Sequence, residues 1–147
     1  MIPVGSPDRI SGYTGHANMP SVYVVEPQSL FTPEIEKLVA EAGGRLIGSS
    51  VALDLDAIIA AAPEFVLLDL DYTSYDVADV LDVLQHEAPL VRPIVLTDRH
   101  RHGWLQLTRA RGAASVVSKA ASEEELVHDL RVVLDGGAIW DTRVEVA

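Results

Sequence analysis

Short, continuous apolar runs alternate with longer amphipathic stretches along most of this sequence. The runs lack the polar residue at every second position that a strand with one solvated face shows, so they predict strands buried on both faces. Such strands are typical of the central parallel sheet of an α/β protein. The predicted strands cover residues 21–25, 45–48, 65–68, 93–96 and 114–118.

The amphipathic stretches carry apolar residues at helical spacing, and three of them have clear start signals. Thr32, followed by Pro33, is the predicted N-cap of the first helix, and Ser74 is that of the third. Ser122, with Glu125 three residues later, forms a capping box for the last helix. The predicted helices cover about 33–42, 53–62, 75–88, 103–111 and 123–135.

Strand and helix therefore alternate five times within the 147 residues, with short connections. Because crossovers between parallel strands are right-handed, we expect a doubly wound α/β fold with one parallel sheet covered on both faces. Residues 1–20 show no periodicity and contain several Gly and Pro residues, which predicts a flexible leader. Residues 141–147 are predicted to be a C-terminal tail or the start of a linker.

Composition narrows the classes of function. The formal net charge of −11 argues against nucleic-acid binding by this chain alone, since phosphate contacts need clustered Lys and Arg. The absence of cysteine excludes disulfides and thiolate metal sites and fits a reducing compartment, so we expect a cytoplasmic protein. No run reaches the ~18 apolar residues of a membrane span, so no membrane association is expected.

The positive charge is unevenly distributed. Five of the 11 basic residues fall within one short span, around the predicted fourth helix. One interpretation is a solvated helix face, and the other is a docking surface for an acidic partner. The five are Arg92, Arg99, Arg101, Arg109 and Arg111.

Polar groups end four of the predicted strands. Glu26 follows the first strand and Asp69 the third, while Thr97 follows the fourth and Lys119 the fifth. In a parallel sheet these ends lie along one edge, where open α/β sheets bind their ligands. Asp69 has no role as a packing residue, because a buried unpaired charge is costly. The sequence therefore predicts that these four side chains converge in one crevice.

This combination resembles the receiver domain of bacterial two-component response regulators over residues 21–140. The resemblance implies a flavodoxin-like (βα)5 fold with strand order 2-1-3-4-5. It also implies that an Asp accepts a phosphoryl group from a histidine kinase or another phosphodonor, with Mg²⁺ present. The ending Gly136–Asp141 resembles the exit of receivers that precede a helix-turn-helix DNA-binding domain.

The resemblance assigns roles to individual residues. The motif Val-Leu-Leu-Asp-Leu places the phosphoryl acceptor at Asp69. Pro-Ile-Val-Leu-Thr places the switch hydroxyl at Thr97, and Val-Val-Ser-Lys places the phosphate-binding ammonium at Lys119. The metal ligands implied are Glu26, Asp69 and the backbone carbonyl of Asp71.

Several positions depart from the family pattern. Pro27 stands where a second metal-binding acid is usual, so Mg²⁺ binding is expected to be weak or absent. Asp98 replaces a small residue after the switch Thr, and Val116 replaces the switch aromatic. Two readings remain: Asp69 is phosphorylated with Asp98 or Asp71 rebuilding the metal site, or the receiver signals through protein contacts or another ligand without phosphoryl transfer.

Three functional hypotheses follow. The first is a signalling receiver that is not an enzyme and that passes its signal by dimerisation or partner binding. The alternative is a phosphorylation-independent interaction module, a homodimer, that forms the N-terminal part of a DNA-binding transcriptional regulator. A flavodoxin-like enzyme or nucleotide binder is disfavoured, because residues 26–29 after the first strand read Glu-Pro-Gln-Ser and form no Gly-rich phosphate loop.

Overall fold

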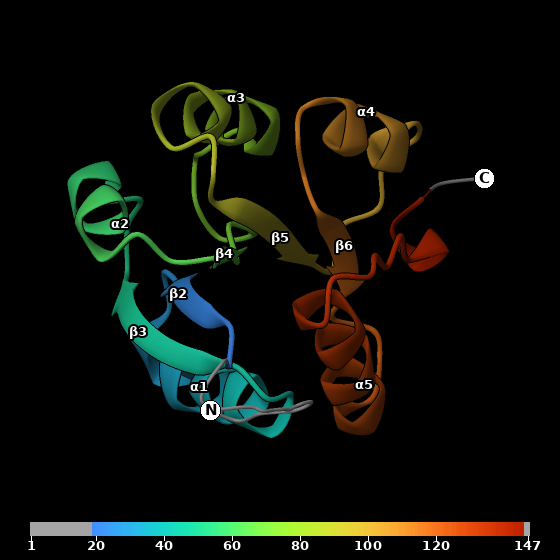
Figure 1. The fold of residues 1–147 in the computed structure, drawn as a ribbon. Coiled ribbons are helices and arrows are strands. Elements are labelled where there is room, and N and C mark those ends of the chain that lie inside the picture. Colours follow the sequence, from blue (N-terminus) through green and yellow to red (C-terminus); the bar gives the residue numbers. More distant parts are fainter. Residues whose placement is uncertain (1–18, 146–147) are drawn as a thin grey trace.

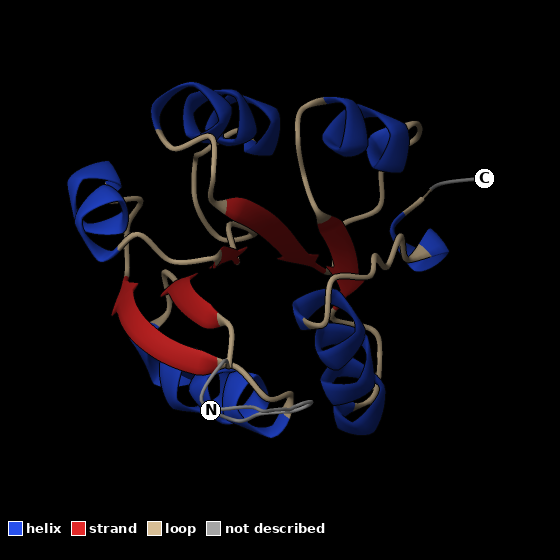
Figure 2. Ribbon diagram, viewed as in Figure 1, coloured by secondary structure: helices blue, strands red, loops and turns tan. Residues whose placement is uncertain are grey.

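The computed structural model describes residues 19–145 and shows one parallel β-sheet between two layers of helices (Figures 1 and 2). The strands are β2 (Ser21–Val25), β3 (Arg45–Ser50), β4 (Phe65–Leu68), β5 (Arg92–Thr97) and β6 (Ser115–Ser118). The α-helices are α1 (Thr32–Glu41), α2 (Leu55–Ala61), α3 (Val77–Glu87), α4 (Trp104–Ala110) and α5 (Glu123–Leu134). Two short 3₁₀ helices complete the described chain, η2 (Ser29–Phe31) and η3 (Thr142–Val144).

The sheet has the order β3-β2-β4-β5-β6, which is 2-1-3-4-5 in chain order. All four neighbouring pairs are parallel, so the predicted doubly wound α/β fold is confirmed. Figure 1 shows α2, α3 and α4 on one face of the sheet and α1 and α5 on the other. The predicted second strand extends two residues further than expected, to Ser50, because β3 continues to pair with β2 up to Val25.

The strands divide their side chains between two apolar layers. Along β2, Val22 and Val24 join the layer under α1 and α5, whereas Tyr23 and Val25 join the layer under α2, α3 and α4. This alternation follows from the two-residue period of a strand, and both faces are apolar because both are covered. The continuous apolar runs of the sequence therefore correspond to strands buried on both sides, as predicted.

Two predicted helix caps are wrong, and each is replaced by a neighbour. Thr32 lies inside the first turn of α1, because η2 leads directly into the helix and Phe31 takes the N-cap position. Ser74 lies before α3, whose N-cap is Asp76; its carboxylate accepts hydrogen bonds from the backbone N–H groups of Ala78 and Asp79 at 2.9 and 3.4 Å. A carboxylate binds two amide groups and also complements the helix dipole.

The predicted capping box of α5 is confirmed. The Ser122 hydroxyl accepts from the Glu125 N–H at 3.1 Å, and the Glu125 carboxylate accepts from the Ser122 N–H at 2.9 Å. This reciprocal pair fixes where α5 begins and therefore the length of the loop that carries Lys119.

The segment after α5 folds back onto the domain, and we name residues 139–145 the C-terminal strap. Its Ile139 carbonyl accepts from the Val116 N–H at 2.9 Å, which extends the sheet beside β6. Its Glu145 carboxylate accepts from the N–H groups of Gly103 and Leu105, at 3.1 and 2.6 Å, and so caps α4. Val144 is fully buried. The described part of the predicted tail, 141–145, is therefore packed, and residues 1–18 of the predicted leader lie outside the described residues.

Between residues 19 and 145, no helix combines the length and the apolar character needed to cross a bilayer.

Candidate functional site

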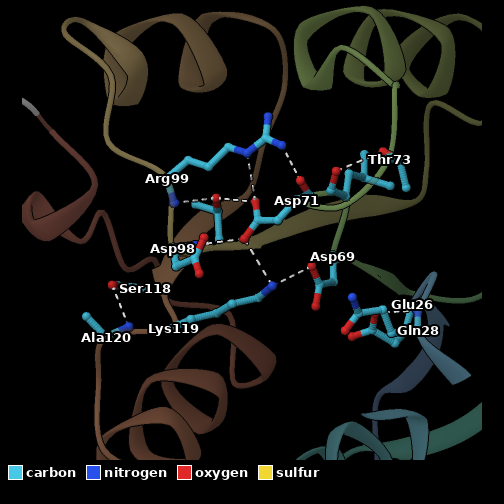
Figure 3. Close-up of polar contacts among 12 residues, drawn as sticks. Glu26, Gln28, Asp69, Asp71, Thr73, Asp98, Arg99, Ser118, Lys119 and Ala120 are labelled. Carbon is cyan, nitrogen blue, oxygen red and sulfur yellow. Dashed lines mark hydrogen bonds and ion pairs between the residues drawn. The ribbon is translucent and has the colours of Figure 1, made fainter. Parts of the chain in front are cut away.

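The carboxyl ends of the strands meet at one edge of the sheet, as Figure 3 shows. Leu68 pairs with both Val25 and Val95 in the ladder, so β2, β4 and β5 end at nearly the same level. Asp69 is the first residue beyond β4, and Lys119 is the first beyond β6. The register of the sheet therefore brings residues from distant parts of the sequence to one place.

Asp69 and Lys119 form a close ion pair. The Lys119 Nζ lies 2.7 Å from the Asp69 Oδ1, and the Asp69 side chain is only 6% exposed. The pair is charge-assisted and largely shielded from water, so it is much stronger than a surface pair. This contact places a positive charge beside the carboxylate of Asp69.

Asp71 belongs to the same buried network. Its Oδ1 accepts from the Thr97 hydroxyl at 2.6 Å, and its Oδ2 accepts from the Asp98 N–H at 2.8 Å. The Lys119 Nζ is also 3.0 Å from this Oδ2. Burial opposes ionisation of the carboxyl, but these hydrogen bonds outweigh it and hold the pKa of Asp71 below its ordinary value. Asp71 is therefore a buried carboxylate held by three different donors.

Arg99 supports Asp71 from the other side. Its Nη2 donates to the Asp71 backbone carbonyl, and its Nε lies 4.0 Å from the Asp71 Oδ1. The Arg99 N–H also donates to the Thr97 hydroxyl oxygen at 3.0 Å. The exposed Asp98 carboxyl faces the Asp71 carboxylate, which raises the pKa of Asp98. The loop after β5 is thus tied to the loop after β4 by backbone and side-chain contacts.

Lys119 links the two carboxylates. Burial alone would lower its pKa, but the hydrogen bonds and charges of Asp69 and Asp71 raise the pKa of Lys119 above its ordinary value. The Nζ also lies 5.5 Å from the centroid of the Tyr72 ring, within the range of a cation–π contact. The ammonium is therefore held in one place by three neighbours.

Glu26 is the least satisfied group of the site. It is 2% exposed, and its Oε2 accepts from the Gln28 N–H at 3.0 Å, but its Oε1 has no hydrogen-bond partner. Burial, and then the neighbouring Asp69 carboxylate, raise the pKa of Glu26 to about 7. A buried oxygen without a partner beside a second carboxylate indicates a place where a proton or a cation is favoured.

The chain resembles known proteins in its structure rather than in its sequence. No family model matches the sequence, and no curated protein sequence matches it either. Solved structures do match. A LuxR family DNA-binding response regulator from Silicibacter pomeroyi has a TM-score of 0.68 and 21% identity, over 84% of this chain and 98% of the other. A LuxR family two-component response regulator from Aurantimonas sp. SI85-9A1 has a TM-score of 0.74 and 15% identity, over 86% and 93%.

The signal receiver domain of the response regulator NarL from Mycobacterium tuberculosis has a TM-score of 0.67 and 21% identity, over 80% of this chain and 98% of the other. The fold is that of a response regulator receiver domain. The structural match covers 98% of the Silicibacter pomeroyi chain and 98% of the NarL receiver chain. The similarity therefore extends over nearly the whole of both chains.

Within the receiver fold, the structure brings the predicted site residues together. The Asp71 carboxylate contacts both Thr97 and Lys119. Lys119 also contacts Asp69, and Glu26 lies beside Asp69. Thr97 itself does not contact Asp69 directly among the hydrogen bonds of the described residues; its hydroxyl is committed to Asp71.

Two features of the site were not found by sequence reasoning. Asp71 was predicted to contribute to a metal site, through its backbone carbonyl or by rebuilding the ligand set, whereas its carboxylate accepts hydrogen bonds from Thr97 and Asp98 and lies beside the Lys119 ammonium. Arg99 was treated only as part of a basic cluster, yet its guanidinium binds that carbonyl. The sequence contains a weak signal for both, because Asp71 and Arg99 each lie two residues beyond a strand-end residue of the site.

The residues present fit magnesium only in a limited way. Mg²⁺ usually keeps several waters and is held by one or two carboxylates. Glu26 and Asp69 offer two such carboxylates, and the orphaned Oε1 of Glu26 is available for a metal. Pro27 adds no side-chain ligand, and the Asp71 carbonyl already accepts a hydrogen bond from Arg99. Over residues 19–145, no group of three or more His, Cys, Asp or Glu side chains has metal-site geometry.

Proposed function

We propose that this chain is a signal receiver module of a two-component system and that Asp69 is its phosphoryl acceptor. One observation carries the proposal: in a receiver fold, the carboxylate directly after β4 is paired at 2.7 Å with the lysine directly after β6. The phosphodonor is a histidine kinase or a small acyl phosphate. In this proposal the module acts in signalling rather than as an enzyme, and the phosphodonor is its reaction partner.

The transfer follows from the groups at the site. An oxygen of the Asp69 carboxylate attacks phosphorus, and the bond from phosphorus to the donor breaks. From a phosphohistidine, the P–N electron pair leaves with the imidazole, which then takes up a proton; from acetyl phosphate, the P–O pair leaves with acetate. The product is an acyl phosphate on Asp69. Lys119 stabilises the negative charge on the phosphoryl oxygens.

Magnesium would be held by Glu26 and Asp69, and when bound it supplies positive charge to the phosphoryl oxygens. With Glu26 buried beside Asp69, the two acids repel each other without a cation, so metal binding and loss of the Glu26 proton are coupled. The chain's own contribution is to orient Asp69 through Lys119 and to keep the carboxylate largely shielded from water.

Intact mass measurement tests the proposal. The protein is incubated with acetyl phosphate and millimolar Mg²⁺, and one added phosphoryl mass is expected. Asp69→Asn removes the acceptor and should abolish the addition, while Asp56→Asn, an exposed acid on α2, should leave it intact. No mass increase in the unaltered protein at high donor concentration would contradict phosphoryl transfer to Asp69.

A second function is supported by different observations. Pro27 offers no side-chain ligand for a metal, and the Thr97 hydroxyl already donates to Asp71. Both features favour an interaction module that works without phosphorylation. Such a module would be the N-terminal part of a DNA-binding regulator and would act as a homodimer. Its surface would be the face of α4 and β6, with the arginine residues in and around α4. There Arg101 is exposed, Arg109 lies over the Trp140 ring at 5.2 Å, and Arg111 pairs with Asp82 at 2.7 Å.

Solution mass distinguishes this alternative. If the unaltered protein is a dimer through α4, Arg101→Glu should shift it toward monomer, because the exposed side chain reverses its charge at the surface. Glu124→Arg, on the exposed side of α5, is the control for a change of charge elsewhere. A dimer that persists in Arg101→Glu, or a protein that is monomeric from the start, counts against dimerisation at this surface.

A further inference from the structure

We propose that the Asp71 carboxylate is an internal anionic ligand that occupies the Thr97 and Lys119 donors, which a phosphoryl group on Asp69 would otherwise use. The unphosphorylated chain thereby keeps its switch hydroxyl in the anion-bound arrangement. This inference rests on the proposed function, because it concerns the regulation of the same site. It predicts a receiver in which Asp71 must be displaced before a phosphoryl group can use these donors.

Hydrogen-bond donors from two strand ends converge on the Asp71 carboxylate. The Thr97 hydroxyl, the Asp98 N–H and the Lys119 ammonium come from the ends of two strands and all point at one carboxylate, at 2.6, 2.8 and 3.0 Å. Figure 3 shows Asp71 between Arg99 and Lys119 with these contacts as dashed lines. These three hydrogen bonds all involve the ionised carboxylate, so they are charge-assisted and stronger than bonds between neutral groups. In this chain the oxyanion is supplied by the protein itself.

Burial restricts the contact between Asp71 and Thr97. Asp71 is 5% exposed and Thr97 is 1% exposed, so the contact between them is inside the domain. The Thr97 oxygen also accepts from the Arg99 N–H at 3.0 Å, which leaves its proton for Asp71. The hydroxyl therefore has a fixed orientation, and it cannot turn to another acceptor until the Asp71 carboxylate withdraws.

The negative charge of Asp71 competes with that of a phosphoryl group on Asp69. Lys119 is shared between Asp69 and Asp71, at 2.7 and 3.0 Å. A phosphoryl group formed on Asp69 would add negative charge next to Asp71 and would need the same ammonium and hydroxyl. Two anions competing for one set of donors in a buried site repel each other. Asp71 consequently opposes both the binding of phosphate-like anions and the transfer itself.

Two variants test this directly, with Asp79→Asn on the exposed face of α3 as the matched control. Asp71→Ala removes the internal anion, and Asp71→Asn keeps its size while removing its charge, which retains a folded comparison if the alanine variant does not fold. The first measurement is the Thr97 hydroxyl proton by NMR, without any donor. In the unaltered protein it should exchange slowly with water, and in Asp71→Ala it should exchange too fast to be seen.

The second measurement is a titration with inorganic phosphate, followed by the chemical shifts of Thr97 and Lys119. Both Asp71 variants should bind phosphate at least about tenfold more tightly than the unaltered protein, since the competing charge has gone. The third is the rate of phosphorylation by acetyl phosphate with Mg²⁺, which should rise by a similar factor. The Asp79→Asn control should match the unaltered protein in all three.

The outcomes separate the two proposals. If no variant accepts a phosphoryl group but the hydroxyl and phosphate measurements behave as expected, Asp69 is not the acceptor and the role of Asp71 stands. If Asp69-dependent phosphorylation occurs but the hydroxyl proton and the phosphate affinity are the same with and without Asp71, the internal-ligand proposal is overturned and the acceptor stands. Where phosphorylation is measurable, equal rates in folded Asp71→Asn and the unaltered protein also overturn it.

Discussion

Lys119 Nζ lies 2.7 Å from Asp69 Oδ1, although the two residues are 50 positions apart. They follow β6 and β4, which are not neighbours in the sheet, so the lysine reaches across the end of β5 to make the contact. The same ammonium also lies 3.0 Å from the Asp71 Oδ2. One side chain thus neutralises two buried carboxylates, and most of the electrostatics of the site depends on it.

Lys119→Gln should destabilise the domain strongly. Removing the ammonium leaves the buried Asp69 carboxylate without its cationic partner and leaves Asp71 with only its hydrogen bonds from Thr97 and Asp98, at an expected cost of about 3 kcal/mol in the free energy of unfolding. Urea unfolding at neutral pH measures it. Lys37→Gln is the matched control, because Lys37 is 64% exposed and its ion pairs with Glu41 and Glu123 are 3.9 and 3.6 Å long. Equal, small effects in both variants would contradict the argument.

Glu26 should make stability depend on pH. Its pKa is raised from 4.5 to about 7 in the folded state, so the folded protein binds this proton more tightly than the unfolded chain does. Stability therefore decreases as pH rises from about 4.5 to about 7, by about 3 kcal/mol at most, and is then constant as far as this group is concerned. Glu26→Gln should remove this part of the decrease.

Unfolding by urea at about pH 5 and about pH 8 measures the difference, and a titration of the labelled Glu26 carboxyl gives the pKa itself. Glu34→Gln, an exposed acid on α1, should leave the pH dependence unchanged. A Glu26 carboxyl that titrates at its ordinary value of 4.5 would show that the buried environment does not hold in solution.

Pro27→Asp should strengthen magnesium binding. The substitution adds a carboxylate next to Glu26 and Asp69, where the chain has only two, and an increase in affinity of about tenfold or more is expected. Magnesium titration followed by chemical shifts near Asp69 measures it. Pro89→Asp, at an exposed position before β5, controls for the added charge. An affinity that does not change would mean that position 27 does not face the metal.

Glu145→Gln should loosen the start of α4. Gly103, the N-cap of this helix, offers no side-chain cap, and Glu145 of the strap binds the Gly103 and Leu105 N–H groups in its place. Loss of the charge should cost about 1 kcal/mol and increase hydrogen exchange at these two amides. Glu124→Gln on α5 is the control. Unchanged exchange at both amides would show that the strap does not cap α4.

The periodicity of the sequence predicted which segments form strands and helices, because that depends on local burial and local hydrogen bonding. The runs at 21–25 and 65–68 became β2 and β4 with the same bounds, and Ser122 with Glu125 began α5 as expected. The alternation of elements also predicted that strand-end residues would share one edge, since right-handed crossovers permit little else.

The remaining features depended on contacts between distant segments. Phe31 and Asp76 replaced the expected caps because η2 and the loop after β4 set where each helix could begin. The sequence did not predict the C-terminal strap, because the strap has no periodic pattern of its own. It is held by contacts with the distant elements α4 and β6.

The sequence by itself determined the receiver architecture and the positions of Asp69, Thr97 and Lys119 at the strand ends. Only the tertiary structure decided that the carboxylate of Asp71 turns inward and takes the donors of Thr97 and Lys119. The reason is physical: a residue's place along the chain sets which edge of the sheet it reaches, but the direction of its side chain is chosen by the donors that the neighbouring loops present.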